Sequence, residues 1–395
     1  MRSLDVMYEE LMHRAWAEIN LDAIAHNMQQ IRKAVSSNSK IMAVVKADAY
    51  GHGFLQVAKT LIDNHADMLA VAVIDEAKQL RSRGIEVPIL ILGTTSYDHA
   101  EDIVDFDVMP TVFNYKFAKL LSDIAVKKDK DVKIHIKIDT GMSRIGYLYH
   151  GKEHDNVIKE ILDISKLPNL EINGIFSHFS KADEPDSEYT ELQFSRFTSL
   201  CNALEQNGLH IQYKHICNSA GLIKYPHMHL DMVRPGIILY GLYPEDALRS
   251  AIDLKPAMEL KAKITRVQTI PKGTPISYGG IYKTNADAKI ATVPIGYADG
   301  YSRNLTGKAK MCVGEEIVNV VGKICMDQCM IDVTNVNNIN EGDQVKVFGC
   351  DKVTADSLAE WLNTINYEVV CFIGKRIPRI YLSGGKAVRV INYIV

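Results

Sequence analysis

A single lysine stands where an apolar segment of the sequence ends. Residues 41–46 read IMAVVK, and the apolar and β-branched side chains before Lys46 are typical of a buried strand. Residues 50–53, YGHG, follow and indicate a turn. A lysine amine at the mouth of an apolar strand can lose its hydration, which lowers its pKa and makes it a candidate Schiff-base nucleophile. The ordinary alternative is a lysine that ends a strand and reaches solvent.

Other polar side chains stand at or near the ends of later apolar segments. They are Lys137, His178, Asn218, Ser219 and Arg234. Because the active site of a parallel α/β barrel lies at the carboxyl ends of its strands, such residues would converge on one site. With Asn218 and Ser219 counted as one position, these residues and Lys46 make five positions, which together favour one active site over separate surface residues.

The elements that would position these residues alternate between strands and helices from about residue 15 to about residue 245. Apolar side chains recur every three or four residues over 21–35 and predict a helix, which Asn20 could cap. Strands are expected at 41–46, 68–73, 88–92, 108–112, 132–138, 172–177, 215–217 and 232–239. This alternation predicts an α/β fold with an N-terminal (β/α)8 TIM-like barrel over residues 15–250. An open doubly wound sheet is the alternative, although no GxGxxG string follows the first strand.

The sequence changes character after about residue 255. Strand-like runs at 260–270, 288–293, 316–321, 330–333 and 344–348 are separated by Gly, Pro, Asp and Asn turns. One helical stretch, 355–362, interrupts them. We expect a C-terminal mainly β domain formed by residues 251–395 together with residues 1–14.

Length and composition exclude several classes of protein. The 395 residues favour two domains, and the 47% hydrophobic and 24% charged residues are ordinary for a soluble globular protein. The net charge of −3 gives no support for a nucleic acid partner, and no run approaches the roughly 18 apolar residues that span a membrane. The N-terminal segment is acidic and lacks an apolar stretch, so we expect no secretory signal and a cytoplasmic protein. The seven scattered cysteines predict reduced thiols and no metal site.

The string VVKADAYGHG at 44–53 resembles the pyridoxal-phosphate lysine motif of alanine racemases. Further strings resemble the same family in the same order, namely KIHIKIDTGMSRIG, GIFSHFS, HICNSAG, VRPGIILYG, TPISYGGIYKT, IGYADGYSR, KICMDQCMI and INYEVVCFIGKRIPR. The resemblance extends from about residue 16 to residue 379 and includes both expected domains. It departs from the family pattern at Ser143, where glycine is common, and in an N-terminus several residues longer than in many relatives.

The resemblance implies pyridoxal 5'-phosphate as cofactor, with Lys46 as its point of attachment. The implied phosphate ligands are Tyr50, Asn218, Ser219, Gly236, Ile237 and Tyr367. The resemblance places Arg234 against the pyridine nitrogen of the cofactor. It places His178 beside the pyridine ring and Arg234. Because arginine only donates hydrogen bonds and stays charged, it would hold that nitrogen as an unprotonated acceptor. The carbanion would then be less delocalised, which should suppress transamination.

Racemisation removes a proton from one face of Cα and returns a proton to the other face, so two bases are the economical solution. Lys46 can serve one face, and the resemblance assigns the other face to Tyr278. A free tyrosine has a pKa of about 10, so neighbours must tune it, and His178 and Arg234 are candidates. In the family the two domains that meet come from different subunits, which implies a homodimer with shared active sites.

The resemblance also assigns residues to the substrate. Arg144 would bind the substrate carboxylate and orient the catalytic tyrosine, while Tyr297 and Met326 would line the entrance and the pocket. In many members the lysine that matches Lys137 is carbamylated and pairs with the arginine that matches Arg144. Whether Lys137 is carbamylated is a hypothesis at this stage.

The leading interpretation is an alanine racemase that supplies D-alanine for peptidoglycan. A related racemase for serine or a larger amino acid is one alternative, but Tyr367 and Met326 should keep the pocket small. An amino acid decarboxylase of similar architecture is a second, but the SYGG and CMDQ strings resemble racemases. A non-catalytic cofactor carrier is a third, but such proteins resemble only the barrel.

Overall fold

The computed structural model describes residue 12 and residues 14–150, 154–185 and 188–394. Contacts divide the chain into two units. One, which we call the barrel unit, comprises Ile24–Ala49 and Phe54–Lys255. The other, the β unit, comprises the described residues up to Ala23, the short segment Tyr50–Gly53, and the described residues from Pro256 onward.

Parallel strands form the centre of the barrel unit. Their order is β5-β4-β3-β2-β10-β9-β8-β6, and a further pairing of β6 with β5 closes a ring of eight strands in the described part of the chain. The strands are β2 (Lys40–Val44), β3 (Met68–Val71), β4 (Ile89–Ile91), β5 (Met109–Val112), β6 (Val132–Asp139), β8 (Leu170–Phe176), β9 (Tyr213–His215) and β10 (Met232–Val233), with β7 (Tyr147–Leu148) beside β6. This confirms the predicted (β/α)8 barrel. The expected strand 232–239 is shorter than predicted, because the chain turns at Pro235 and continues as a 3-10 turn, η3 (Ile237–Tyr240).

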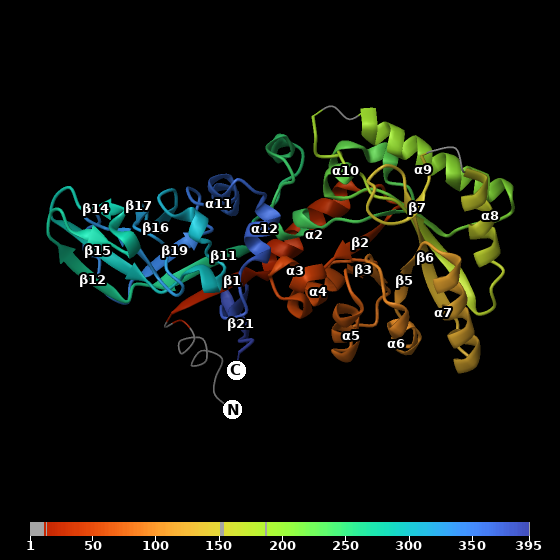
Figure 1. Ribbon diagram of the computed structural model, residues 1–395, viewed down its shortest axis with the longest axis horizontal. Coiled ribbons are helices and arrows are strands. Elements are labelled where there is room, and N and C mark those ends of the chain that lie inside the picture. The colour runs from red at the N-terminus through yellow and green to blue at the C-terminus, as the bar shows by residue number, and fades with distance from the viewer. Residues whose placement is uncertain (1–11, 13, 151–153, 186–187, 395) are drawn as a thin grey trace. The chain divides into compact units, whose positions relative to one another are not determined.

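Helices cover the outside of these strands, and in Figure 1 helices α5, α6 and α7 lie on the outer side of the sheet. The helices of this part of the chain are α2 (Leu21–Ala34), α4 (Phe54–Asp63), α5 (Ile74–Ser82), α6 (Ala100–Asp105), α7 (Tyr115–Lys128), α8 (His154–Ile164), α9 (Glu188–Gln206) and α10 (Ser219–Lys224), with 3-10 turns η1 (Tyr97–His99), η2 (Pro226–Met228) and η4 (Asp246–Ser250). The helix predicted at 21–35 is α2, and the Asn20 side chain accepts the Ala23 N–H at 3.0 Å as a cap. Within the described ranges, no helix combines the length and the apolarity needed to cross a membrane.

The β unit is built on one large sheet with the order β12-β15-β18-β17-β16-β19-β11-β1-β20-β21. Its strands are β1 (Ala15–Asn20), β11 (Met258–Lys263), β12 (Arg266–Ile270), β15 (Ala288–Val293), β16 (Lys310–Val313), β17 (Glu316–Val321), β18 (Cys329–Asp332), β19 (Gln344–Phe348), β20 (Arg379–Ser383) and β21 (Lys386–Ile391). A small hairpin, helices and 3-10 turns complete it: β13 (Pro275–Ile276), β14 (Tyr282–Lys283), α11 (Ala355–Leu362), α12 (Asn366–Cys371), η5 (Tyr278–Gly280), η6 (Tyr297–Asp299) and η7 (Arg303–Leu305). The mainly β second domain is therefore confirmed. The run expected as one strand at 260–270 is two strands, and α12 was not predicted.

The strand β1, which was not among the predicted strands, lies in the large sheet of the β unit. It pairs antiparallel with β11 and parallel with β20, so that Ile19 lies opposite both Met258 and Tyr381. Trp16 and Ile19 are fully buried. Residues 15–20, which we expected to begin the barrel, thus belong to the β unit, and the second boundary falls after Lys255 instead of residue 250. Because Ala15–Ile19 is buried on both faces, no alternation of apolar and polar residues marks it as a strand of a separate sheet.

One expectation about cysteines is wrong. Cys312 in β16 and Cys350, just after β19, form a disulfide, although we expected reduced thiols throughout. The two strands are neighbours in the sheet, with Cys312 opposite Lys346, and this pairing brings the two thiols together across 38 positions of sequence. Nothing local in the sequence signals that proximity.

Candidate active site

Lys46 begins a short turn, α3 (Lys46–Tyr50), directly after β2. The backbone of this turn is left-handed: φ is 53° at Ala47, 54° at Asp48 and Ala49, and 52° at Tyr50. For residues other than glycine this conformation costs about 1–2 kcal/mol each. Surrounding contacts must therefore hold the turn in place, and the residue that they fix is the lysine at its start.

Glu76 on α5 supplies such a contact. Its Oε1 accepts the N–H of Ala47 at 2.6 Å, and its Oε2 accepts the N–H of Ala72 at 2.7 Å. One carboxylate therefore joins the backbone next to Lys46 to the end of β3. Sequence reasoning did not identify Glu76, because a contact with backbone atoms 29 residues away leaves no local pattern.

Arg234 is buried just after β10, with a side chain that is 3% exposed. Its guanidinium donates to His215 Nδ1 at 2.7 Å, to His178 Nδ1 at 3.0 Å, and to the carbonyls of Ser177 at 2.7 Å and Ile216 at 3.0 Å. None of these four partners is an acid, so the charge of Arg234 is solvated only by neutral dipoles. Burial accordingly lowers the pKa of Arg234 to about 10.

The histidines around Arg234 have defined tautomers. Because arginine can only donate, Nδ1 of His215 and of His178 must accept, and each ring then carries its proton on Nε2. His215 in turn donates from Nε2 to Nδ1 of His135 at 2.9 Å. Burial and the charge of Arg234 lower the pKa of His178 and His215 well below its usual value, and that of His135 to about 3. His178 is therefore a neutral ring that offers an N–H.

Cationic side chains gather around His178. After burial, the charges that depress the pKa of His178 are those of Arg234, Lys137, Arg144 and Lys46. Burial, together with the charges of Arg234 and Arg144, also lowers the pKa of Lys137 well below its usual value. These four residues therefore lie close enough to His178 to act on it electrostatically, and all five belong to the strands of the barrel or to the segments that follow them. Such a concentration of donors and positive charge suits a ligand with several anionic groups.

The loop that carries Arg144 folds around the carboxylate of Asp139. Oδ1 of Asp139 accepts the N–H groups of Gly141 and Met142 at 2.9 Å and of Ser143 at 3.1 Å, and Oδ2 accepts that of Arg144 at 3.1 Å. Burial alone would raise the pKa of Asp139, but these backbone donors outweigh it and hold the pKa below its usual value. Ser143 has a φ of 57°, a backbone conformation that favours glycine.

The ends of β9 and β10 form two linked loops. The Asn218 side chain accepts the Gly221 N–H at 2.9 Å, and Ser219 Oγ accepts the Gly236 N–H at 2.9 Å. Ile237 follows Gly236 at the start of η3. A Cβ on Gly221 would lie 2.9 Å from the Phe179 ring, so the backbone here requires a residue without a side chain. The four predicted phosphate ligands in this region are therefore neighbours.

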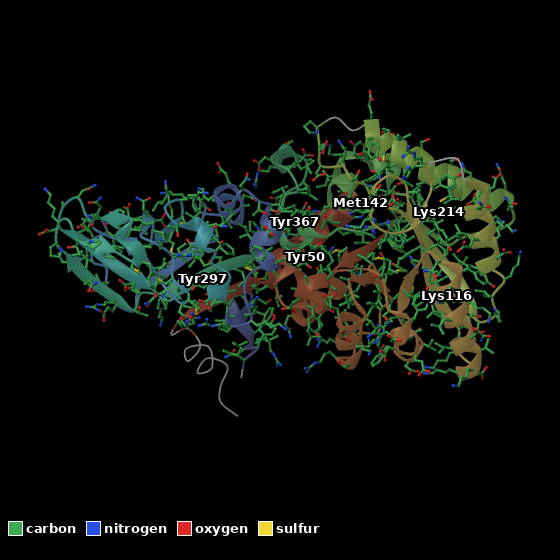
Figure 2. The ribbon with its side chains drawn as sticks, in the orientation of Figure 1. Tyr50, Lys116, Met142, Lys214, Tyr297 and Tyr367 are labelled. Atoms are coloured by element: carbon green, nitrogen blue, oxygen red, sulfur yellow. A yellow bond between two sulfur atoms is a disulfide. The ribbon has the colours of Figure 1, made fainter. Side chains whose placement is uncertain are left out.

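Two further predicted phosphate ligands, Tyr50 and Tyr367, belong to the β unit. Their ring centroids are 6.2 Å apart, and Figure 2 labels both side chains. Burial raises the pKa of Tyr50 well above its usual value, so its phenol stays neutral. The backbone next to Tyr50 is fixed by Arg379, whose Nε donates to the Gly51 carbonyl at 3.0 Å.

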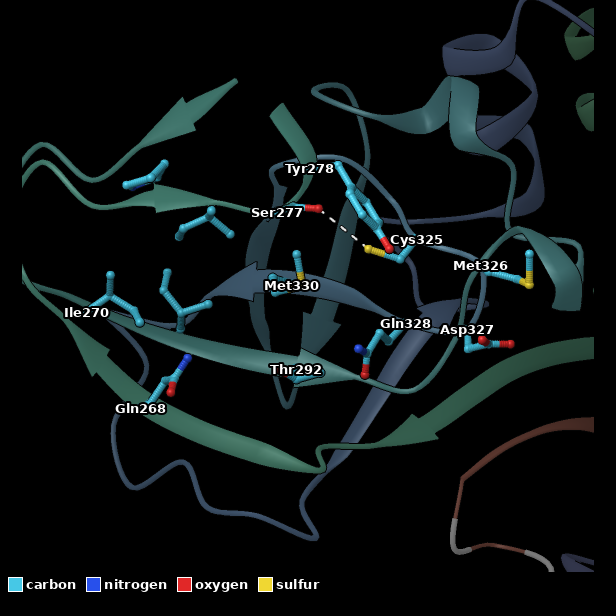
Figure 3. Close-up of a pocket in the computed structure, with 13 residues that line it drawn as sticks. Gln268, Ile270, Ser277, Tyr278, Thr292, Cys325, Met326, Asp327, Gln328 and Met330 are labelled. Carbon is cyan, nitrogen blue, oxygen red and sulfur yellow. Dashed lines mark hydrogen bonds between the residues drawn. The ribbon is translucent and has the colours of Figure 1, made fainter. Parts of the chain in front are cut away.

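Tyr278 lies at a pocket of about 540 Å³ within the β unit (Figure 3). Its side chain is 68% exposed, and that of Met326, which also lines the pocket, is 52% exposed. Ser277 donates from Oγ to the Lys323 carbonyl at 2.6 Å and lies 3.5 Å from the Cys325 thiol, as the dashed line in Figure 3 marks. The turn that carries Tyr278 is therefore anchored by hydrogen bonds, while the ring of Tyr278 is exposed.

Tyr297 stands on the loop next to Met326. The Tyr297 N–H donates to the Cys325 carbonyl at 3.1 Å, and the Ala298 N–H donates to the Met326 carbonyl at 3.0 Å. Tyr297 is 42% exposed. The two residues predicted to shape the entrance and the pocket are thus held side by side through their backbones.

A buried carboxylate that sequence reasoning missed supports this loop. Asp299 is fully buried, and Arg14 donates to its two oxygens at 2.9 and 2.6 Å. Asp299 Oδ2 also accepts the Gly296 N–H at 3.0 Å. The acidic residue in the string IGYADGYSR was visible in the sequence, but its distant arginine partner was not.

Two family models match the chain: the N-terminal domain of alanine racemase over residues 19–244 and the C-terminal domain of alanine racemase over residues 257–381. The chain is 48% identical over 384 residues to an alanine racemase of Clostridium tetani, which covers 96% of this chain and 98% of that protein. It is also 48% identical over 374 residues to an alanine racemase of Methanococcus maripaludis, covering 94% and 99%.

Solved structures agree with these matches. An alanine racemase of Clostridium difficile 630 superposes with a TM-score of 0.94 at 40% identity, covering 97% of this chain and 99% of that one. An alanine racemase of Bacillus anthracis, solved with bound L-Ala-P, superposes with a TM-score of 0.90 at 36% identity, covering 97% and 98%. With both domains matched and the identity sustained over nearly its whole length, the chain belongs to the alanine racemase family and is an isomerase of that family.

Proposed function

We propose that this racemase interconverts L-alanine and D-alanine with pyridoxal 5'-phosphate, in the cytoplasm, and supplies D-alanine for peptidoglycan. The observation that carries the proposal is the convergence of Lys46, Lys137, Arg144 and Arg234 around the neutral ring of His178. The Bacillus anthracis relative, which holds L-Ala-P, supports alanine as the substrate.

The residues present fit the cofactor. Arg234 has donors and no acid among its four partners, which suits an unprotonated pyridine nitrogen. The proposed phosphate ligands are Tyr50, Asn218, Ser219, Gly236, Ile237 and Tyr367, which offer hydroxyl, amide and backbone N–H groups. Lys46 is the proposed point of attachment. When bound, pyridoxal phosphate supplies the electron withdrawal that acidifies the Cα–H of the amino acid.

Two side chains of this protein would move the proton. The amine of Lys46 would take or return it on one face of Cα, and the hydroxyl of Tyr278 on the other. Arg144 would bind the substrate carboxylate and keep Cα between the two bases. His178 offers its Nε2–H, a donor that would stabilise the oxygen of Tyr278 in the form that accepts a proton.

A homodimer with shared sites is part of the proposal. Tyr278, Met326 and Tyr297 each leave more than a third of their surface exposed, although each has an assigned role. Large apolar or aromatic side chains that cluster on an exposed face commonly mark a protein interface. We propose that this face of the β unit contributes Tyr278, Tyr297 and Met326 to the active site of the partner subunit.

We expect Lys137 to be carbamylated. Its side chain is buried, and burial together with the charges of Arg234 and Arg144 lowers its pKa well below the usual value, which favours the neutral amine that reacts with carbon dioxide. The carbamate would place a negative charge beside Arg144 and Arg234, whose positive charges disfavour a protonated lysine. Intact mass under non-acidic conditions should show the mass of one added carbon dioxide. Lys137→Ala, which cannot carry it, is the control, and an unmodified mass in the parent protein would contradict this expectation.

The function is tested by measuring D-alanine formed from L-alanine with added pyridoxal phosphate, using D-amino-acid oxidase, with L-serine in parallel. We expect rapid formation of D-alanine and little D-serine, because Tyr367 and Met326 should keep the pocket small. Faster racemisation of serine than of alanine would show that serine, and not alanine, is the substrate. A bound cofactor without turnover of either amino acid would contradict the proposed function.

A further inference from the structure

Helix α9 carries three polar side chains on one face that none of the roles above uses. They are Tyr189, Gln193 and Arg196, spaced four and three positions apart, so they share one side of the helix. All three reach the segments that follow β6 and β8, which carry Arg144 and His178.

Gln193 contacts both segments at once. Its Nε2 donates to the His178 carbonyl at 3.0 Å and to Thr140 Oγ1 at 3.3 Å. Its Oε1 accepts the N–H of Ser180 at 2.9 Å and the Ser180 hydroxyl at 3.1 Å. The side chain is fully buried, so water does not compete for these bonds. A single amide group therefore connects the backbone of His178 with the first residue of the Arg144 loop.

Tyr189 and Arg196 both donate hydrogen bonds to the Arg144 loop. The Tyr189 hydroxyl donates to the Gly141 carbonyl at 2.8 Å, and Arg196 Nη1 donates to the Thr140 carbonyl at 2.9 Å. Gly141 has a φ of 135°, and a Cβ there would lie 2.2 Å from the Tyr189 oxygen. The start of this loop therefore lies directly against α9.

The same loop is held from its other side by Asp139, which accepts four of its N–H groups. A hydrogen bond of 2.7 Å between the hydroxyls of Thr140 and Ser177 adds a second connection between the two segments. Arg144 therefore extends from a backbone that is fixed on two sides. His178, which accepts a hydrogen bond from Arg234, extends from a backbone fixed by Gln193.

We propose that Gln193 is a positioning residue that fixes the segments of His178 and Arg144 relative to each other. Tyr189 and Arg196 position the segment of Arg144 alone. This inference rests on the proposed function, in which His178 would stabilise the oxygen of the second base, Tyr278, and Arg144 would bind the substrate carboxylate. A displacement of about 1 Å at reacting groups can cost 10²-fold in rate, so a distant amide can control turnover.

The test is Gln193→Glu, an isosteric change that keeps the acceptor for Ser180 and removes both donors. The matched control is Gln206→Glu, the same change at an exposed position near the end of the same helix. For alanine, we expect Gln193→Glu to lower kcat at least about tenfold and to raise KM, because two buried acceptors lose their donor. Gln206→Glu should match the parent enzyme.

A second variant separates positioning from general destabilisation. Tyr189→Phe removes one hydroxyl from a half-buried ring, so we expect it to raise KM for alanine several-fold with kcat nearly unchanged. Hydrogen exchange, which does not depend on turnover, should show faster exchange at 139–146 and 177–180 in Gln193→Glu and only at 139–146 in Tyr189→Phe.

Equal kinetic constants in Gln193→Glu and the parent enzyme would overturn the inference, as would faster exchange spread over the whole barrel. If the parent enzyme failed to racemise alanine, the proposed function would fail, and the exchange pattern alone would decide whether Gln193 connects the two segments.

Discussion

Lys46→Ala is expected to abolish both racemisation and the near-visible absorbance of bound pyridoxal phosphate. The amine is the proposed point of covalent attachment and also one of the two bases, and alanine can perform neither task. Loss of a general base alone typically costs 10²–10⁴-fold, so we expect a loss of at least about 10⁴-fold. The measurement is an absorbance spectrum after incubation with the cofactor and dialysis, together with the D-alanine assay.

The matched control is Lys40→Ala, at the start of β2, the strand that precedes Lys46. Lys40 is exposed and pairs with Asp67 at 2.9 Å, so its loss should leave the spectrum and the activity unchanged. Absorbance that survives dialysis in Lys46→Ala would contradict the assignment of the attachment site.

Heterodimers that combine Lys46→Ala with Tyr278→Phe test whether each active site is shared by two subunits. Tyr278→Phe should bind cofactor normally but slow the conversion of L-alanine to D-alanine, because one face of Cα loses its base. If Lys46 and Tyr278 of one site come from different subunits, refolding Lys46→Ala with Tyr278→Phe creates heterodimers with one intact site. Activity should then rise above that of either variant alone, and no recovery would argue against shared sites.

Arg234→Glu should reverse the electrostatics of the cofactor site and have the second large effect. The guanidinium now donates to two histidine nitrogens and two carbonyls, all of which are acceptors. A carboxylate also only accepts, so His178 and His215 would each need a proton on Nδ1 to pair with it, either by a change of tautomer or by protonation, and the negative charge would raise their pKa. Each buried polar group left unpaired costs about 1–3 kcal/mol, so racemisation should fall at least about 10²-fold.

The informative readout is the ratio of transamination to racemisation, measured as pyruvate against D-alanine. A glutamate would keep the pyridine nitrogen protonated and strengthen its electron withdrawal, so we expect the ratio to rise. Arg234→Lys keeps a cationic donor and should preserve the ratio even if the rate drops. A ratio that is the same in the glutamate variant and the parent enzyme would refute the proposed role of Arg234.

The barrel could be predicted because its elements leave local patterns in the sequence, whereas the roles of the site residues come from the family resemblance and stay predictions. Lys46 follows an apolar run, the helix over 21–35 shows a period of three to four residues, and Asn20 precedes it as a cap. The strand β1 could not be placed, because it is buried on both faces and its partners lie more than two hundred residues away. The disulfide between Cys312 and Cys350 was missed for the same reason, since sheet pairing creates it.

The supporting residues of the site were missed for a different physical reason. Glu76 and Gln193 act on backbone N–H and carbonyl groups, and every residue except proline offers the same backbone groups. From the sequence alone, a glutamine in a helix is therefore expected on the surface. Only the positions of the strand ends show that it contacts the backbone of the site. Family resemblance identified the residues proposed to touch cofactor and substrate, but it gave no information about the side chains behind them.

The position of β1 has a consequence for synthesis of the chain. This strand leaves the ribosome before the barrel, yet it pairs with β11 and β20, which begin at Met258 and Arg379. Its apolar side chains, including Trp16, stay without their partner strands while the barrel segments are translated. The large sheet is completed only near the end of translation. A gene fragment that starts at residue 256 would encode a sheet without an interior strand and with two unpaired edges. Separate expression of this sheet therefore requires that β1 be fused to it, for example by circular permutation.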